Sequence, residues 1–108
     1  SGSGPAFFAF YLDSIIKYAI DSGFTRKQAV DIAYSTSGGA LSYLQNSNLL
    51  PEKFIELVSS PKGTTEEGIK YLKSNGFKKI IIDCHKKSAK RSQSISLKNE
   101  LLLRRKAK

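Results

Sequence analysis

The sequence predicts an all-α domain of about five helices, and three observations support this prediction. Apolar residues recur at helical spacing along most of the 108 residues. Helix start and stop signals, including proline, threonine caps and glycine, divide the chain into five segments. The three isoleucines at residues 80–82 are the one strand-like run, and the sequence contains no second strand candidate that could pair with them.

The composition is typical of a single globular domain. The chain is 40% hydrophobic and 25% charged, and its length suits one core. A single cysteine, Cys84, rules out an internal disulfide and fits a reducing compartment. The sequence has no apolar run of membrane-spanning length and no visible signal peptide, so we expect a cytoplasmic protein with no membrane partner.

The first helix is predicted over residues 5–21, with Pro5 in its first turn. The preceding Ser-Gly-Ser-Gly reads either as a flexible linker or as a cap provided by Ser3 or Gly4. The helix is apolar on most sides, and these residues are Phe7, Phe8, Phe10, Tyr11, Leu12, Ile15, Ile16, Ala19 and Ile20. Because such a helix must be buried nearly all round, the sequence predicts a partner chain or a partner domain.

The second helix is predicted over residues 26–46. Gly23 ends the first helix, and Thr25 with Gln28 forms a capping box. Gly38 and Gly39 lie in the middle of this helix and cost about 1 kcal/mol each relative to alanine. We therefore expect another helix to pack closely against them; the alternative is a break into two shorter helices.

Three further helices follow. A short one begins at Pro51, the next covers about residues 65–74 and stops at Asn75-Gly76, and the last starts near Phe77 and continues past Ile95.

The net charge of +9 is concentrated at the C-terminus. Residues 1–85 contain nine basic and eight acidic residues, a balance of +1, whereas residues 86–108 contain nine basic residues and Glu100, a balance of +8. Such a tail is either solvated or contacts an acidic partner. Without zinc-ligand spacing or an aromatic-spaced basic strand, a nucleic-acid partner is not expected.

Catalytic residue types are sparse. His85 is the only histidine, with no ligand cluster at metal-binding spacing, so we expect no metal site. Cys84 and His85 point about 100° apart on a helix, so the imidazole cannot activate the thiol. No glycine-rich loop follows a strand, so the chain has no dinucleotide-binding unit of its own.

The segment at residues 59–68 is the one candidate site. Pro61 fixes one φ angle, and Gly63 permits a positive φ or a close approach to the backbone. Thr64 and Glu67 read as a capping box. The helix start favours an anion, to which Thr64 and Thr65 would offer hydroxyls. From spacing alone, a capped helix that follows a loop is the more common explanation of such a segment.

The residues at these positions resemble those of pyrroline-5-carboxylate reductase, over its C-terminal helical domain. The resemblance covers roughly residues 1–95 and rests on residues 1–6, on the Ser-Pro-Lys-Gly-Thr-Thr motif at residues 60–65, on Asn75-Gly76-Phe77 and on Arg91. Because the family begins this domain with the same six residues, the resemblance also favours a native start over a linker. The basic tail, residues 96–108, lies outside it.

The resemblance implies an interleaved homodimer that can build larger rings. In the family, a preceding Rossmann domain holds NAD(P)H, and that domain is absent from this chain. The family enzyme reduces 1-pyrroline-5-carboxylate to L-proline in proline biosynthesis. We therefore expect NAD(P)H in the full-length enzyme, and neither cofactor binding nor activity from this fragment alone.

The resemblance also implies roles for the motif residues. Backbone amides around Gly63 and Thr64 would hold the substrate carboxylate, and Thr65 would offer its hydroxyl to the ring nitrogen as the catalytic contact. Ser60 would lie beside substrate and nicotinamide. Ser3 and Gly4 would let the nicotinamide end approach the first helix.

Two departures from the family pattern stand out. The family's usual glycine is Lys62 here, which costs about 1–2 kcal/mol if the position needs φ > 0, although its ammonium can attract the substrate carboxylate. Asn48 replaces a usual acidic residue. The alternative function is a non-catalytic helical interaction domain whose basic tail binds an acidic partner.

Overall fold

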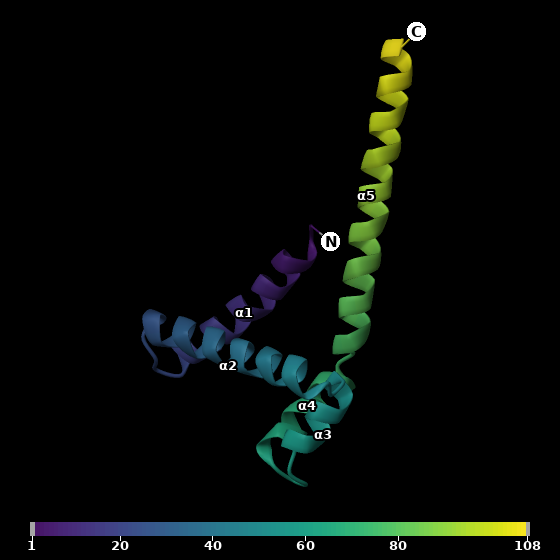
Figure 1. Ribbon diagram of the computed structural model, residues 1–108. Helices are drawn as coiled ribbons and strands as arrows, with labels where there is room; N and C mark the ends of the chain where they lie inside the picture. The colour runs from purple at the N-terminus through teal and green to yellow at the C-terminus, as the bar shows by residue number, and fades with distance from the viewer. Residues whose placement is uncertain (1, 108) are drawn as a thin grey trace. The chain divides into compact units, whose positions relative to one another are not determined.

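The computed structural model describes residues 2–107, of which Ala107 is described by its backbone alone, so Ser1 of the N-terminal motif and Lys108 lie outside the described residues. Every regular element in that range is an α-helix, which confirms the all-α prediction (Figure 1). The helices are α1 (Gly4–Asp21), α2 (Arg26–Ser47), α3 (Pro51–Val58), α4 (Thr64–Ser74) and α5 (Phe77–Ala107). The chain forms two compact units, residues 1–58 and 59–108, which are described separately below.

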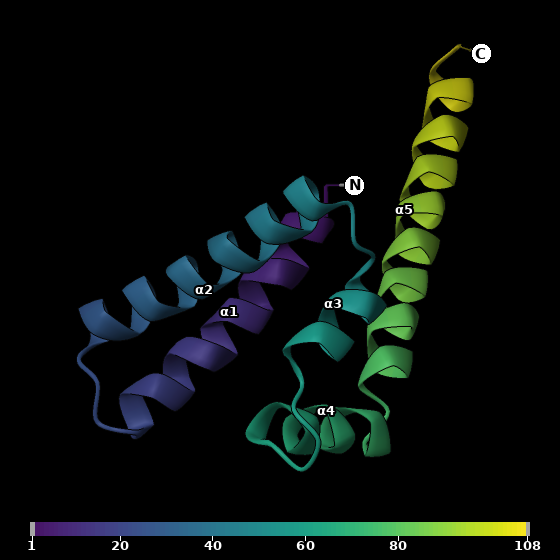
Figure 2. The same cartoon turned by 60° about the horizontal axis from the view of Figure 1, so that its bottom comes forward.

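The first unit begins with a helical hairpin of α1 and α2, which lie side by side (Figure 2). Gly23 turns the chain at φ +111°. The predicted capping box is present: the Gln28 backbone N–H donates to Thr25 Oγ1 at 3.2 Å, and the Thr25 N–H donates to Gln28 Oε1 at 3.0 Å. Both bonds satisfy donors that have no partner within the helix, so the start of α2 is fixed locally.

The core of this hairpin is small. Among residues 2–106, the buried apolar side chains are Ala19, Ala29 and Ala33. Large aromatic side chains of α1 remain exposed, with Phe10 at 77% and Tyr18 at 73%. The alanines permit close helix contact but remove little apolar surface from water, so the hairpin leaves most of the hydrophobic free energy of α1 unused.

Helix α2 runs without a break through Gly38 and Gly39, so the alternative of two shorter helices is wrong. A Cβ added at either glycine would meet nothing within 4 Å. Within the described residues of the first unit, therefore, no helix packs closely against this face. The predicted close contact remains a prediction, and no helix of the first unit provides it.

Helix α3 joins the first unit through aromatic contact. Asn48 ends α2 with φ 59°, a left-handed conformation that asparagine tolerates better than most residues. The chain then enters α3 at Pro51, as predicted. The rings of Tyr43 and Phe54 lie with centroids 5.3 Å apart, in the favourable range for an aromatic pair.

The second unit contains α4 and α5. Gly76, at φ +71°, makes the turn between them directly after Asn75, which confirms the predicted stop. Residues 80–82 lie inside α5, so rejecting a strand there was correct. Helix α5 continues past Ile95 to Ala107, 31 residues in all.

Candidate functional site

The turn before α4 is held by one short backbone bond. The Gly63 N–H donates to the Ser60 carbonyl at 2.9 Å. A Cβ on Gly63 would lie 3.1 Å from that carbonyl oxygen and 3.2 Å from the Ser60 Cβ. Of the two expectations for Gly63, a positive φ is wrong, since its φ is −85°, and close approach of the backbone is confirmed.

The positive φ belongs to Lys62 instead. Its φ is 62°, in the left-handed region where a lysine side chain costs about 1–2 kcal/mol. The Lys62 N–H donates to Glu66 Oε2 at 3.2 Å, and this bond offsets part of the strain. A lysine therefore occupies a backbone position that suits glycine, the residue that the resemblance implies there.

Helix α4 begins one residue earlier than predicted, and the predicted Thr64–Glu67 capping box is wrong. The N-cap is Gly63, whose extended backbone (φ −85°, ψ 178°) suits that position, and no side chain caps the helix. Thr64 is consequently the first helical residue. The Glu67 N–H donates to the Gly63 carbonyl at 3.2 Å. The carboxylate that accepts a backbone N–H from before the helix belongs to Glu66, and the donor is Lys62. The sequence signal for this was a glycine that can serve as an N-cap.

This geometry determines which backbone amides lack an acceptor within the turn and the helix. The Gly63 amide is already used within the turn. The amides of Thr64 and Thr65 lie in the first turn of α4, where no acceptor within the helix is available. Both threonines are exposed. The helix start can therefore offer two amides and two hydroxyls to an anion, beside the cationic side chain of Lys62.

The structure brings part of the predicted site together. Ser60, Lys62, Gly63, Thr64 and Thr65 share one turn and the start of one helix in the second unit.

Ser3 and Gly4 belong to the first unit, at the start of α1. Ser3 is the N-cap residue, without a side-chain capping bond, and its carbonyl accepts the Phe7 N–H at 3.1 Å. Gly4 leaves open space, because a Cβ there would meet nothing within 4 Å.

A groove on the first unit follows α1 and α2. Its volume is about 480 Å³. Its walls are mostly apolar and come from Phe8, Tyr11 and Ile15 of α1 and Ala40, Leu41 and Leu44 of α2. The apolar residues expected on the first helix include Phe8, Tyr11 and Ile15, and those expected on the second helix include Leu41 and Leu44. The sequence did not indicate that these residues line one groove, because helical spacing does not say which faces of two helices meet.

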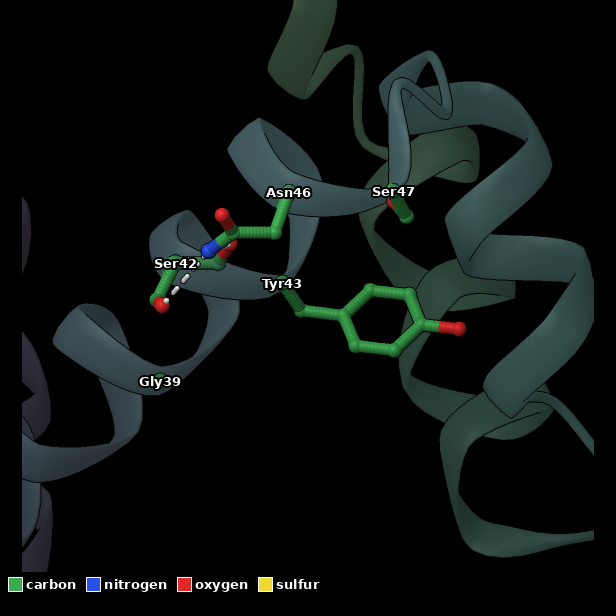
Figure 3. A pocket seen from close by; sticks show the side chains of 5 residues that line it. All are labelled: Gly39, Ser42, Tyr43, Asn46 and Ser47. Atoms are coloured by element: carbon green, nitrogen blue, oxygen red, sulfur yellow. Dashed lines mark hydrogen bonds between the residues drawn. The ribbon is translucent and has the colours of Figure 1, made fainter.

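A second hollow lies on α2 beside Gly39 (Figure 3). Asn46 Nδ2 donates to the Ser42 carbonyl at 2.7 Å and to Ser42 Oγ at 3.3 Å, while the Tyr43 ring extends to the other side (Figure 3). Gly39 also lines a third hollow, with Phe54 and Leu57 of α3. Because Gly39 has no side chain, it lines both of these hollows on the surface of α2.

The imidazole of His85 bonds to the backbone of its own helix. His85 Nδ1 donates to the Ile81 carbonyl at 2.9 Å along α5, and Cys84 is half-buried. Over residues 2–107, the structure holds no group of three or more side chains suited to a metal ion. In the same range, no helix is long and apolar enough to cross a lipid bilayer.

Known proteins resemble most of this chain. Residues 1–95 match the family described as pyrroline-5-carboxylate reductase dimerisation. Pyrroline-5-carboxylate reductase of Aquifex aeolicus is 36% identical over 95 residues, which are 88% of this chain and 36% of that protein. Pyrroline-5-carboxylate reductase 2 of Bacillus subtilis is 37% identical over 95 residues, 88% of this chain and 34% of the relative.

A solved structure supports the same assignment. The crystal structure of Plasmodium falciparum pyrroline carboxylate reductase with NADP bound superimposes with a TM-score of 0.73 at 25% identity, over 77% of this chain and 32% of that one. The chain thus spans about a third of the length of these relatives. Because the family match covers nearly nine-tenths of the sequence, the chain belongs to the pyrroline-5-carboxylate reductase dimerisation family.

Proposed function

We propose that this chain is the dimerisation and substrate-binding part of a pyrroline-5-carboxylate reductase, which reduces 1-pyrroline-5-carboxylate to L-proline with NAD(P)H. Family membership supports the reaction. The observation that carries the site is the turn at Ser60–Gly63, which leads directly into the exposed first turn of α4. Such a helix start is suited to a carboxylate.

In this proposal, the substrate carboxylate lies against the amides of Thr64 and Thr65. Those amides have no acceptor within the helix, whereas the Gly63 amide is engaged with Ser60. Gly63 contributes by keeping the turn tight. Lys62 adds an ammonium at the edge of the site, and its positive charge favours an anionic substrate over a neutral one.

Thr65 is the proposed catalytic contact, with its hydroxyl donating to the ring nitrogen. The nitrogen must end protonated, and a threonine hydroxyl is a poor acid by itself, so the proton passes through water or another group. Orientation and electrostatics are sufficient protein contributions to a hydride transfer.

NAD(P)H supplies the hydride, and this chain contributes a small part of its binding. Ser60 carries an exposed hydroxyl for the nicotinamide side. Gly4 fits close approach by the cofactor, since nothing lies within 4 Å of its missing Cβ, and Ser3 precedes it at the start of α1. The rest of the cofactor is proposed to be held by a part of the reductase outside this chain; the Plasmodium falciparum relative, of which this chain covers 32%, has NADP bound.

A second copy of the chain is the proposed occupant of the groove on the first unit. Burial of exposed apolar residues that line the groove, such as Phe8 and Leu41, stabilises by about 1.5–3 kcal/mol per side chain. The family's description as a dimerisation domain supports a homodimer, which can assemble further into rings. The reductase is proposed to work in the cytoplasm.

The experiment that tests the site is Thr65→Ala in the intact reductase. We expect kcat/KM to fall by about 100-fold, as removal of one well-placed polar contact can cause. Thr65→Ser keeps the hydroxyl and should recover most of the rate. A near-normal rate for Thr65→Ala removes Thr65 from the site.

Sedimentation tests the dimer. The 108-residue chain should sediment as a dimer at micromolar concentration. A well-folded monomer under those conditions contradicts the proposed burial of α1.

A further inference from the structure

Helix α5 carries a stripe of cations along one side. Its members are exposed, and they are Lys86, Lys87, Lys90, Arg91, Lys98, Arg104 and Arg105. Successive residues of an α-helix are separated by about 100°, which places all seven within an arc of about 140°. With a rise of about 1.5 Å per residue, this basic stripe is about 28 Å long.

Negative charge near the stripe is scarce. From residue 86 onward, Glu100 is the one acidic residue in the sequence, and its carboxylate is 2.8 Å from Arg104 Nη2. An exposed pair of this kind contributes little to stability. Most of the positive charge of the stripe is therefore not neutralised within the helix and can attract an acidic partner.

Two leucines lie inside the stripe. Leu97 and Leu101 are four residues apart, so they occupy neighbouring positions on the same side of α5, flanked by the cations. They are 58% and 50% exposed. The opposite side of the helix carries uncharged residues, including Ser92 and Ser96. An apolar centre with a charged rim is the arrangement found in protein interfaces.

We propose that the basic stripe with Leu97 and Leu101 docks an acidic amphipathic helix of another protein. Charge complementarity selects an acidic partner, and the two leucines select one that also presents apolar side chains. Both leucines and the cations from Lys98 onward lie beyond residue 95, outside the part of the chain that matches the family, whereas the cations from Lys86 to Arg91 lie inside it. None of these residues belongs to the Ser60–Thr65 segment of the proposed reductase site.

The charge and the narrow apolar centre argue against other occupants. A second copy would bring residues 86–108, with a balance of +8, against the same charge. A lipid surface requires one broad apolar face, whereas the exposed apolar residues of this part of α5 are spread around the helix; they are Ile95, Leu97, Leu101, Leu102 and Leu103. The phosphates of a nucleic-acid backbone bind the cations, but they do not bury the two leucine side chains.

The test uses the full chain and labelled synthetic helical peptides in fluorescence anisotropy at 150 mM salt. One peptide carries glutamates with leucines at four-residue spacing; the matched peptide replaces the leucines by alanine at the same charge. We expect the leucine peptide to bind at least tenfold more tightly. Leu97→Ala with Leu101→Ala should remove that preference, and Lys98→Gln with Arg105→Gln should weaken binding of both peptides by tenfold or more.

The control is Ser92→Ala with Leu103→Ala, which changes the other side of α5 and should alter binding by less than twofold. Circular dichroism verifies that each variant keeps its helix content. Equal binding of the two peptides overturns the proposal. Tighter binding of a 20-base-pair DNA duplex or of phosphatidylserine vesicles also overturns it, because the stripe would then be a general polyanion surface.

Discussion

The backbone N–H of Lys62 donates to the carboxylate of Glu66 at 3.2 Å, across the junction between the turn and α4. A residue in the left-handed region is thereby tied to the first turn of the helix that follows it. The shape of the Ser60–Gly63 turn consequently depends on a side chain inside α4, which makes Glu66 a positioning residue for the proposed site.

Removing the Glu66 carboxylate should loosen this junction. We expect Glu66→Ala to lower the free energy of unfolding by about 0.5–1.5 kcal/mol, the usual net value of one hydrogen bond. Urea unfolding followed by circular dichroism measures it. Glu67→Ala is the matched control, since Glu67 shares the first turn and its helix-dipole benefit without the bond to Lys62. Equal losses in the two variants would show that the bond adds nothing.

Lysine-to-glycine substitutions should have opposite signs at two positions of the second unit. Lys62→Gly relieves left-handed strain and, after the added entropy of the unfolded chain, should raise stability by about 0.5–1 kcal/mol. Lys70→Gly places glycine inside α4 and should cost about 1 kcal/mol. Thermal and urea unfolding compare the two.

In the intact reductase, Lys62→Gly should also raise KM severalfold, because the ammonium is lost; an unchanged KM would remove Lys62 from substrate binding.

Alanine substitutions at two glycines separate close approach from helix propensity. Gly63→Ala brings a Cβ to 3.1 Å from the Ser60 carbonyl oxygen and should destabilise by about 1–3 kcal/mol. Gly68→Ala, inside α4 with nothing within 4 Å, should stabilise by up to about 1 kcal/mol. If Gly63→Ala were as stable as the parent chain, the turn would have another conformation open to it.

The small face of α2 should matter to assembly more than to the single chain. Gly39→Ala meets no neighbour within 4 Å and improves helix propensity, so helix content should not fall. If a partner helix approaches this face, the added methyl should raise the dimer dissociation constant tenfold or more in sedimentation. Gly68→Ala serves as the control with unchanged association. A Gly39→Ala dimer as tight as the parent places the interface elsewhere.

Local signals in the sequence were sufficient for most of the fold. The Thr25–Gln28 box, Pro51 and Asn75-Gly76 fixed helix ends correctly because each acts through its own backbone. Helix α2 was predicted whole, despite Gly38, since about 1 kcal/mol per glycine is small against the propensity of 22 residues.

The turn before α4 was harder to predict because two residues are candidates for the N-cap and two are candidates for the positive φ angle. Gly63 and Thr64 are both acceptable N-caps, and the close approach to Ser60 decides for Gly63. A positive φ at Lys62 runs against residue preference, and the Glu66 bond that supports it is visible only in three dimensions.

The three buried alanines have a consequence for the life of the chain in a cell. A copy without a partner exposes Phe10 and Tyr18, and its hairpin has little packing of its own to resist opening. Chaperones and proteases act continuously on the fraction of a protein that is open, so such an orphan copy is short-lived. The steady-state level of this protein should therefore follow the concentration at which copies find one another, and synthesis below that concentration would leave little of it behind.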